Sequence, residues 1–250
     1  MNKNCLIIVI LFFAVLPTLS SAQGFTYKAE MVRMDSTWDK NNNAEIAKII
    51  GEYKPLVDAS MQEVIGFSEF DMHSGRPESL LSNFAADALL EESRLLSSGG
   101  KIDFSLTNFG GLRASIPAGD IKRYHIFATF PFDNYIVILD MTGKSVREMF
   151  ESFAARREEA FSHTVKMMAK DRKLISLHIN GEPVDDNKIY RVATIDFLLG
   201  GGDNMRALKE AIAVEETGVV LRDAYVNYVL RQTKEGKKVT SYITNRAVIE

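Results

Sequence analysis

Cysteine is almost absent from this chain. Its 250 residues include a single cysteine, Cys5, which lies near the N-terminus ahead of an apolar run. A fold held together by disulfides is therefore excluded, and so is a zinc site or a nucleophile built on cysteine. Because Cys5 precedes the apolar run instead of following it, we do not expect a lipid anchor on this residue either.

An excess of charge of one sign is also missing. Lys and Arg together number 30 and Asp and Glu 33, which gives a formal net charge of -3 and a pI near 5.9. Such a chain exerts no long-range attraction on polyanions, so nucleic acid is not an expected partner. With 46% hydrophobic and 25% charged residues, the composition is that of a soluble globular protein.

The N-terminal apolar run is too short to span a bilayer comfortably. It covers the eleven residues Leu6 to Leu16, whereas a transmembrane helix needs roughly 20. Lys3 precedes the run and small residues ending at Ala22 follow it, which is the layout of a secretory signal peptide. We therefore expect a signal peptide over residues 1–22, in preference to an anchor, and no membrane span after cleavage. A polar segment over residues 23–43 and one domain over residues 44–250 would follow.

Periodic apolar positions predict long helices in both halves of the chain, and short β-rich runs bounded by Gly, Pro or Asn lie between them. The predicted class is α+β, a mixed β-sheet flanked by helices. The expected helices are Ala44–Ile65 (interrupted or kinked near Pro55), Glu78–Leu96, Lys144–Glu159 and Leu221–Gln232. The expected strands are Phe25–Met34, Phe104–Thr107, Ile126–Phe130, Tyr135–Asp140, Leu174–Ile179, Tyr190–Ile195 and Val239–Ile243.

Three clusters near the ends of these strands combine glycine or proline with an aromatic or charged side chain. In the first, Thr107-Asn108-Phe109-Gly110-Gly111-Leu112-Arg113, the paired glycines would let a ligand approach the backbone. Arg113 offers a planar fork suited to phosphate or carboxylate. A simple β-turn that carries a surface arginine fits the same residues.

The other two clusters each carry a phenylalanine. In Phe130-Pro131-Phe132-Asp133-Asn134, Phe132 can stack on a flat ligand and Asn134 can both donate and accept hydrogen bonds, although core packing of Phe132 is the alternative. In the run from Asp196 to Asp203, Phe197 and three glycines precede Asp203, whose carboxylate suits a sugar diol. Asp203 would equally serve as a helix N-cap, and the two roles are compatible.

Taken in order, these clusters and their flanks resemble the C-terminal domain of 5'-nucleotidases, including UDP-sugar hydrolases. The resemblance is specific over Met61–Asp203 and looser from Ala44 to the C-terminus. It is carried by VIGFSEFDMHSGRPESLLSNFAADALL, TNFGGLRASIPAGDI, FPFDNYIVILDMTGKSVREMF and INGEPVDDNKIYRVATIDFLLGGGD.

The resemblance implies a nucleotide site. The two rings that clasp the base match Phe132 and Phe197, and the aspartate that holds the ribose hydroxyls matches Asp203. The residues that match the sugar-phosphate side and the second turn are Asn108, Gly110, Gly111, Arg113 and Asn134. The chain departs from the family at Arg76, which lies out of register with the family's additional arginines, and at Asn204, where glycine is usual.

No metal site is expected in this chain, because the family's metal ligands lie in a separate N-terminal domain. The four histidines, at 73, 125, 163 and 178, form none of the groupings that a two-metal phosphoesterase needs. Asp71-Met72-His73 imitates one such motif without its companions, and we interpret it as a coincidence. Divalent metals are expected only in a partner, and no cofactor in this chain.

Two functions follow from the resemblance. The first is the nucleotide-recognition part of a split 5'-nucleotidase, which acts in nucleotide catabolism with a separate metallophosphoesterase subunit and is negligibly active alone. The second is a stand-alone periplasmic protein that binds nucleosides or nucleotides without catalysis. A degenerate remnant is the third alternative, and the family favours export to the periplasm in each case.

Overall fold

The computed structural model describes residues 26–38, 43–156 and 159–250. The predicted signal peptide lies outside these residues. The chain divides into two compact units, residues up to Glu52 and residues from Tyr53 onward, and the helix α2 (Ala44–Met61) crosses the division. None of the helices in the described part is long and apolar enough to cross a membrane.

The N-terminal expectations are only partly met. Of the strand predicted over Phe25–Met34, Phe25 lies outside the described residues and residues 26–34 form no strand. The predicted helix Ala44–Ile65 is a single helix that contains Pro55 but ends at Met61. Its last predicted residues belong instead to a strand that pairs with a distant segment, because Ile65 is buried there.

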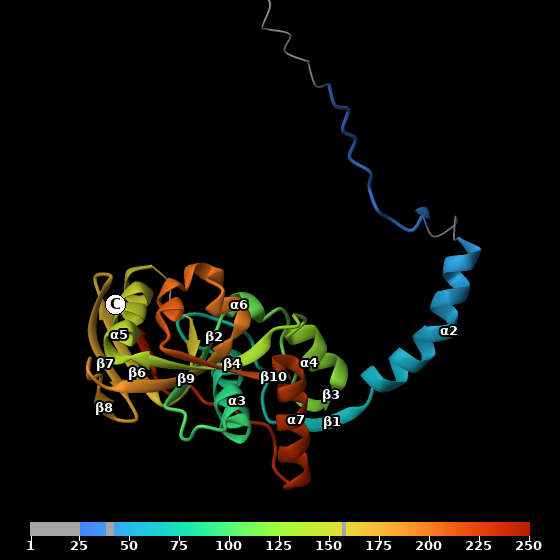
Figure 1. The fold of residues 1–250 in the computed structure, drawn as a ribbon. Helices are drawn as coiled ribbons and strands as arrows, with labels where there is room; N and C mark the ends of the chain where they lie inside the picture. Colours follow the sequence, from blue (N-terminus) through green and yellow to red (C-terminus); the bar gives the residue numbers. More distant parts are fainter. Residues whose placement is uncertain (1–25, 39–42, 157–158) are drawn as a thin grey trace, which may run out of the picture. The chain divides into compact units, whose positions relative to one another are not determined.

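A five-stranded mixed sheet forms the centre of the second unit (Figure 1). Its strand order is β10-β4-β9-β2-β5, in which β2 and β9 are parallel and the other pairs antiparallel. The strands are β2 (Phe104–Thr107), β4 (Tyr135–Thr142), β5 (Ala160–Phe161), β9 (Ile189–Ile195) and β10 (Ala213–Val220). β2 and most of β9 are buried on both faces, as is typical of strands in the centre of a covered sheet.

Helices cover this sheet. α3 contacts β2, β5 and β9, α5 contacts the sheet and η5, and α7 packs beside α3. A capping box begins α3, in which Ser79 Oγ accepts from the Ser82 backbone N–H while Ser82 Oγ accepts from the Ser79 backbone N–H. The bounds are α3 (Leu80–Leu96), α5 (Gly143–Ala155), α6 (Asp196–Leu199), η4 (Gly202–Asn204), η5 (Arg206–Glu210) and α7 (Leu221–Lys234).

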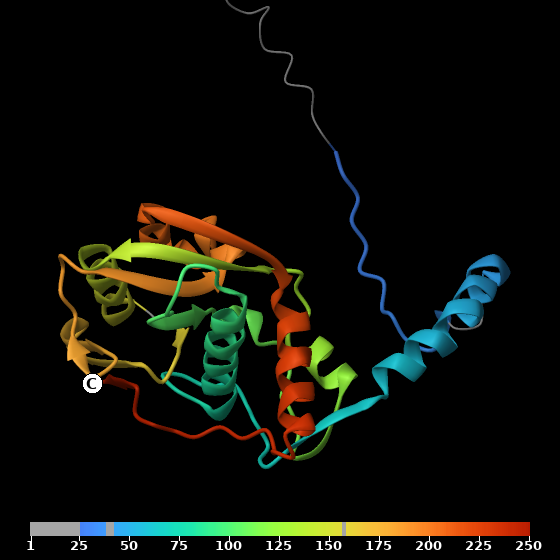
Figure 2. The same ribbon diagram turned by 60° about the horizontal axis from the view of Figure 1, so that its bottom comes forward.

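Two smaller sheets complete the unit. One pairs β1 with β3, and the other has the order β11-β6-β7-β8. The C-terminal segment after α7 runs past α3 and joins the second of these sheets (Figure 2), where β11 pairs in parallel with β6. The bounds are β1 (Val64–Ser68), β3 (Gly119–Lys122), β6 (Val165–Lys170), β7 (Lys173–Ile179), β8 (Glu182–Pro183) and β11 (Ala247–Ile249).

The α+β prediction of a mixed sheet flanked by helices is confirmed. The predicted helices Glu78–Leu96 and Leu221–Gln232 correspond to α3 and α7. The strands Phe104–Thr107, Tyr135–Asp140, Leu174–Ile179 and Tyr190–Ile195 are β2 and parts of β4, β7 and β9.

Two further predicted strands are wrong. Ile126–Phe130 lies almost wholly in the helix α4 (Arg123–Thr129), because Ile126 and Phe130 are four residues apart and both buried, which is helical spacing. Val239–Ile243 makes only one isolated bridge, between Val239 and Ser68. This segment crosses the start of α3, where the Tyr242 carbonyl accepts a hydrogen bond from Asn83 Nδ2.

The predicted helix Lys144–Glu159 ends earlier than expected. α5 stops at Ala155, residues 157–158 lie outside the described part, and Glu159 is not helical. The helix is predictable from the sequence because apolar residues recur at helical spacing, and these residues are buried on one face: Val146, Met149, Phe150 and Phe153.

A buried ion pair anchors the C-terminal segment to α3. Arg246, whose side chain is 3% exposed, donates from Nη1 and Nη2 to the two carboxylate oxygens of Asp87 at 2.9 Å each. The Asp87 side chain is 28% exposed. Burial alone would raise the pKa of Asp87, but hydrogen bonds from His163 and Arg246 outweigh it and hold the pKa below its ordinary value.

We expect Asp87→Asn to lower the free energy of unfolding by about 2 kcal/mol at pH 7, since it removes a hydrogen-bonded charge. A depressed pKa stabilises the fold above the ordinary value of 3.8, and this contribution disappears as the pH falls through the folded pKa. The difference should therefore shrink at pH 3, as measured by urea denaturation, with the exposed Asp120→Asn as control. An equal penalty at both pH values would show that the ionised carboxylate is not responsible.

Candidate functional site

Strand pairing brings the three sequence clusters to one edge of the central sheet. β2 is parallel to β9, with Phe104 beside Val192, so both strands end at this edge. β4 is antiparallel to β9, with Ile136 opposite Ile195, so β4 begins where β9 ends. The loops after β2, before β4 and after β9 therefore meet.

A hydrogen bond joins two of these loops directly. Asn108 Nδ2 donates to Asp203 Oδ2 at 2.5 Å, across 95 residues of sequence. Asn108 is only 6% exposed, and among the described residues its Oδ1 has no hydrogen-bond partner. A Cβ on Gly111, in the turn η3 (Phe109–Gly111), would lie 2.8 Å from this Oδ1 and would push against the Asn108 side chain. The cluster thus presents a fixed carboxylate beside an unpaired buried acceptor.

Asp203 does not act as a helix N-cap. It lies inside η4 with φ = 50°, and Met205 precedes η5 without a side-chain cap. Gly201 (φ = 94°) and Asn204 (φ = 61°) share this left-handed conformation. Such residues are uncommon outside glycine and cluster at functional sites. The carboxylate is therefore free of a capping role and is oriented by Asn108.

The two candidate rings are both half exposed. Phe132 is 47% and Phe197 46% exposed, and among the described residues no ring contact joins them. Core packing of Phe132 is therefore not its role. Phe132 lines a small pocket together with Asn108, Gly111 and Asn134. The Phe197 ring lies against Gly202, where a Cβ would come within 2.4 Å of it.

The Phe197 ring does not line this pocket, and neither does Arg113, whose side chain is not brought into the set. Its backbone N–H donates to the Thr129 carbonyl at 2.9 Å, while its side chain is exposed and does not line the pocket. The alternative of a surface arginine after a turn describes its position in this structure. Arg113 follows Gly110 and Gly111 closely in the sequence, and its long exposed side chain can adopt several conformations.

Glu159 and Arg76 support the first loop, and the sequence did not single out Glu159. Its buried carboxylate accepts from the Phe109 backbone N–H at 2.8 Å and lies 3.8 Å from Arg76 Nη2. The Arg76 guanidinium stacks 4.0 Å from the centre of the Phe109 ring. No sequence signal marks an acidic residue that becomes buried after a helix, so Glu159 could only be found in the structure.

Asp196 and Arg222 hold the other two loops. Asp196 Oδ1 accepts from the backbone N–H groups of Tyr135 at 3.1 Å and Phe197 at 2.7 Å, so it ties the start of β4 to the loop after β9. Arg222 donates to the Pro131 carbonyl at 3.1 Å and to Asp133 Oδ1 at 2.6 Å. Asp196 could have been found from the sequence, because it directly follows a predicted strand. Arg222 could not, because it lies on α7, far along the chain from the turn that it contacts.

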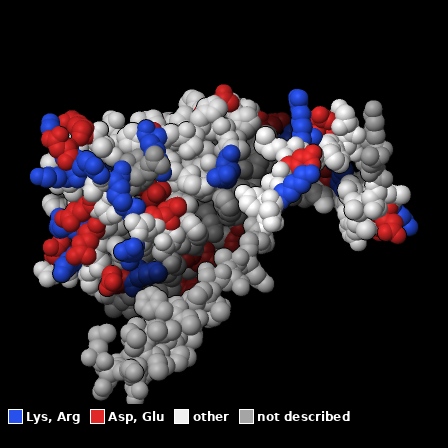
Figure 3. Space-filling view, turned by 90° about the horizontal axis from the view of Figure 1, so that it is seen from above, with Lys and Arg blue, Asp and Glu red and all other residues white. Residues whose placement is uncertain are grey.

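Metal ligands do not gather in the described residues. No group of three or more His, Cys, Asp and Glu side chains there is placed to hold a metal ion. In the Asp71-Met72-His73 motif, Asp71 accepts from the Ala118 backbone N–H and His73 Nδ1 is 2.7 Å from Ser115 Oγ. Figure 3 shows Lys and Arg interspersed with Asp and Glu over the α5 side of the domain.

Sequence comparison places these loops in a known family. Residues 59–210 match the family described as "5'-nucleotidase, C-terminal domain". Protein UshA of Escherichia coli K12 is 36% identical over 135 residues, which cover 52% of this chain and 24% of UshA. The trifunctional nucleotide phosphoesterase protein YfkN of Bacillus subtilis is 28% identical over 224 residues, or 82% of this chain and 15% of YfkN. The chain thus spans a quarter or less of these relatives.

A solved structure extends the likeness beyond the matched segment. The 5'-nucleotidase precursor of Thermus thermophilus superposes with a TM-score of 0.69 at 26% sequence identity, over 81% of this chain and 42% of that one. All three candidate loops fall within residues 59–210. The family match, the shared fold and the loop arrangement agree: the chain belongs to the 5'-nucleotidase C-terminal domain family.

Proposed function

We propose that this chain binds nucleosides and nucleotides at the edge where the three loops meet. The base would stack between Phe132 and Phe197, and the ribose hydroxyls would donate to Asp203. The observation that carries this proposal is the bond from Asn108 Nδ2 to Asp203 Oδ2, which leaves a buried Asn108 Oδ1 without a partner among the described residues, in the pocket that Phe132 also lines. An unpaired buried acceptor is costly unless a water or a ligand satisfies it, and a ligand in the adjoining pocket would do so.

The polar groups around the rings support recognition of the ligand edges. Asn134 lines the pocket with Asn108, so its amide can both donate to and accept from a base. Stacking is worth roughly 1 to 3 kcal/mol per base and a hydrogen bond to the carboxylate about 1.5 to 3 kcal/mol. After the costs of ordering the ligand, we expect dissociation constants in the range of about micromolar to millimolar.

Recognition of a phosphate group would fall mainly to Arg113. Its exposed side chain has no ion pair or hydrogen bond among the described residues, so it is available to a ligand. The Arg76 side chain instead contacts the Phe109 ring and the Glu159 carboxylate. We therefore expect the family's other arginine positions to contribute only weakly to phosphate binding in this chain. Binding should therefore depend more on base and ribose than on phosphate.

We further propose that hydrolysis depends on a separately encoded metallophosphoesterase subunit, exported to the same compartment, so that the pair acts as a split 5'-nucleotidase. The relatives named for nucleotide hydrolysis are much longer than this chain, which spans 15% of YfkN and 42% of the Thermus thermophilus enzyme. In this arrangement the present chain holds the nucleoside, and the partner's metal ions act on the phosphate. A stand-alone periplasmic binding protein is the alternative outcome.

The rings give the first test. We expect isothermal titration calorimetry of the chain without residues 1–22 to show saturable binding of adenosine and AMP. Phe197→Ala and Phe132→Ala should each weaken binding by about 1 to 3 kcal/mol because a stacking surface is lost. Phe67→Ala on β1, where the ring is 43% exposed, is the matched control and should have no effect. Unchanged affinity in both ring variants would reject the site.

Gly202 gives a second test that removes no side chain. A Cβ at this position would lie within 2.4 Å of the Phe197 ring, whereas a Cβ on Gly200 meets nothing closer than 3.4 Å. Gly202→Ala should displace the ring and weaken adenosine binding by about 1 kcal/mol or more, and Gly200→Ala should not. Equal affinities for the two variants, both with wild-type melting temperature, would mean that the ring position is irrelevant.

The split arrangement predicts negligible hydrolysis of AMP by the purified chain with added Mn²⁺ or Zn²⁺, measured as phosphate release. Addition of an exported metallophosphoesterase from the same organism should produce activity that is lost with Asp203→Ala. Metal-dependent hydrolysis by the chain alone that survives stringent purification would contradict this arrangement. Nucleoside binding with no activating partner would favour the stand-alone protein.

A further inference from the structure

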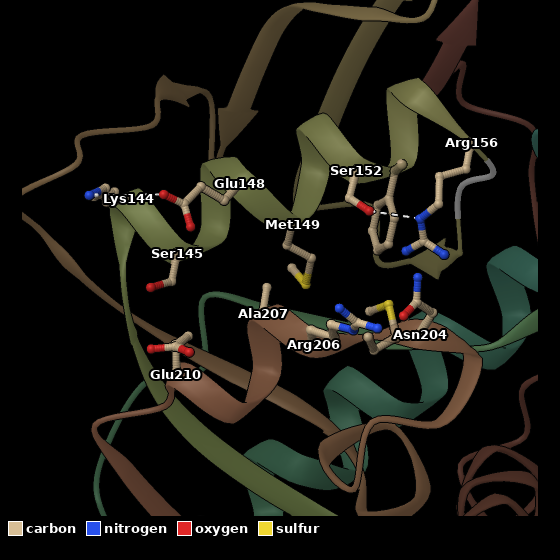
Figure 4. A pocket seen from close by; sticks show the side chains of 12 residues that line it. Lys144, Ser145, Glu148, Met149, Ser152, Arg156, Asn204, Arg206, Ala207 and Glu210 are labelled. Atoms are coloured by element: carbon tan, nitrogen blue, oxygen red, sulfur yellow. Dashed lines mark hydrogen bonds and ion pairs between the residues drawn. The ribbon is translucent and has the colours of Figure 1, made fainter. Parts of the chain in front are cut away.

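A second cleft lies next to the Asp203 loop and is separate from the small pocket lined by Phe132 and Asn108. One wall is α5 and the other is the segment from Asn204 to Glu210, and the cleft encloses about 530 Å³ (Figure 4). Met149, Phe153 and Met205 in its lining are almost fully buried, so they form an apolar floor. A cleft of this size can hold a small organic molecule.

The charges around this cleft are unevenly distributed. The guanidinium groups of Arg156 and Arg206 lie at the end near Asn204, while Glu148 and Glu210 lie toward the other end (Figure 4). Glu148 is already accompanied by Lys144 at 4.0 Å. Within the part of the chain that the structure describes, neither Arg156 nor Arg206 has an ion pair. Two unneutralised guanidinium groups that face one cleft attract an oxyanion.

Arg156 connects this cleft to the proposed ribose site. Its Nε donates to Ser152 Oγ at 2.8 Å, and its Nη1 donates to the backbone carbonyl of Asp203 at 3.3 Å. The turn around Asp203 consists largely of left-handed residues, which are stable only when their surroundings hold them. An anion that fixes the Arg156 guanidinium would therefore also fix the turn that carries the Asp203 carboxylate.

We propose that this cleft is a regulatory oxyanion site that binds a phosphate group between Arg156 and Arg206 and thereby tightens nucleoside binding at Asp203. The phosphate group is free inorganic phosphate or is carried by a small sugar phosphate, whose hydroxyls would face Glu148 and Glu210. The coupling to nucleoside affinity rests on the proposed function of Asp203, whereas the anion site itself does not.

The test first asks whether the anion binds. Inorganic phosphate and ribose 5-phosphate are titrated separately into the ¹⁵N-labelled chain lacking residues 1–22, with chloride at matched ionic strength. Both phosphates should shift the backbone amides of residues 204–210 saturably, and Arg206→Gln should abolish the shifts. Arg94→Gln, an exposed arginine on α3, should retain them. A stronger response to ribose 5-phosphate would identify a sugar phosphate as the ligand, and equal responses would identify the free ion.

The second measurement tests the coupling with adenosine, which carries no phosphate of its own. Millimolar phosphate should lower the dissociation constant of adenosine about fivefold in the wild-type chain. The effect should be absent in Arg206→Gln and present in Arg113→Gln. Loss of the effect in Arg113→Gln, or no amide shifts at residues 204–210, would overturn the proposal. If adenosine does not bind under any condition, the proposed function fails while the amide shifts still decide the anion site.

Discussion

The pairing of β9 with β2 on one side and β4 on the other is the constraint on which the site depends. Because β2 and β9 are parallel and β4 is antiparallel to β9, two strand ends and one strand start meet at a single edge. The bond between Asn108 and Asp203 then closes a contact across 95 residues. Without this strand order, the same three loops would point to opposite edges of the sheet.

Charged groups, and not disulfides, hold these loops in place. Asp196 accepts backbone N–H groups from two loops, Glu159 accepts one from the Gly-Gly turn, and Arg222 bonds to the turn before β4. Each of these polar groups is engaged with backbone or with an opposite charge, which offsets its loss of hydration. The rings of Phe132 and Phe197 can therefore remain half exposed, because other residues supply the rigidity.

The pattern of apolar residues along the sequence predicted the helices and strands that have a continuous apolar face. It failed where contacts between distant residues decide whether a segment is a helix or a strand. α3 and α7 have clear helical spacing, and β2 and β9 are short segments rich in aromatic and β-branched residues between turn residues. The run from Ile126 to Phe130 is also rich in aromatic and β-branched residues, but it is too short for periodicity to separate strand from helix. β10 was missed because it is an edge strand with two adjacent glutamates, so its pairing with β4 leaves little trace in the sequence.

The sequence by itself determined the fold class and the family, since both are carried by residue types at fixed spacings, and it predicted which ring, amide and carboxylate residues form the site. Only the tertiary structure decided that Asn108 orients Asp203, that Phe132 stays out of the core and that the Arg113 side chain lies apart from the pocket. The same holds for the cleft between α5 and residues 204–210. Such features depend on contacts between residues far apart in the chain, and no local propensity encodes which distant groups will meet.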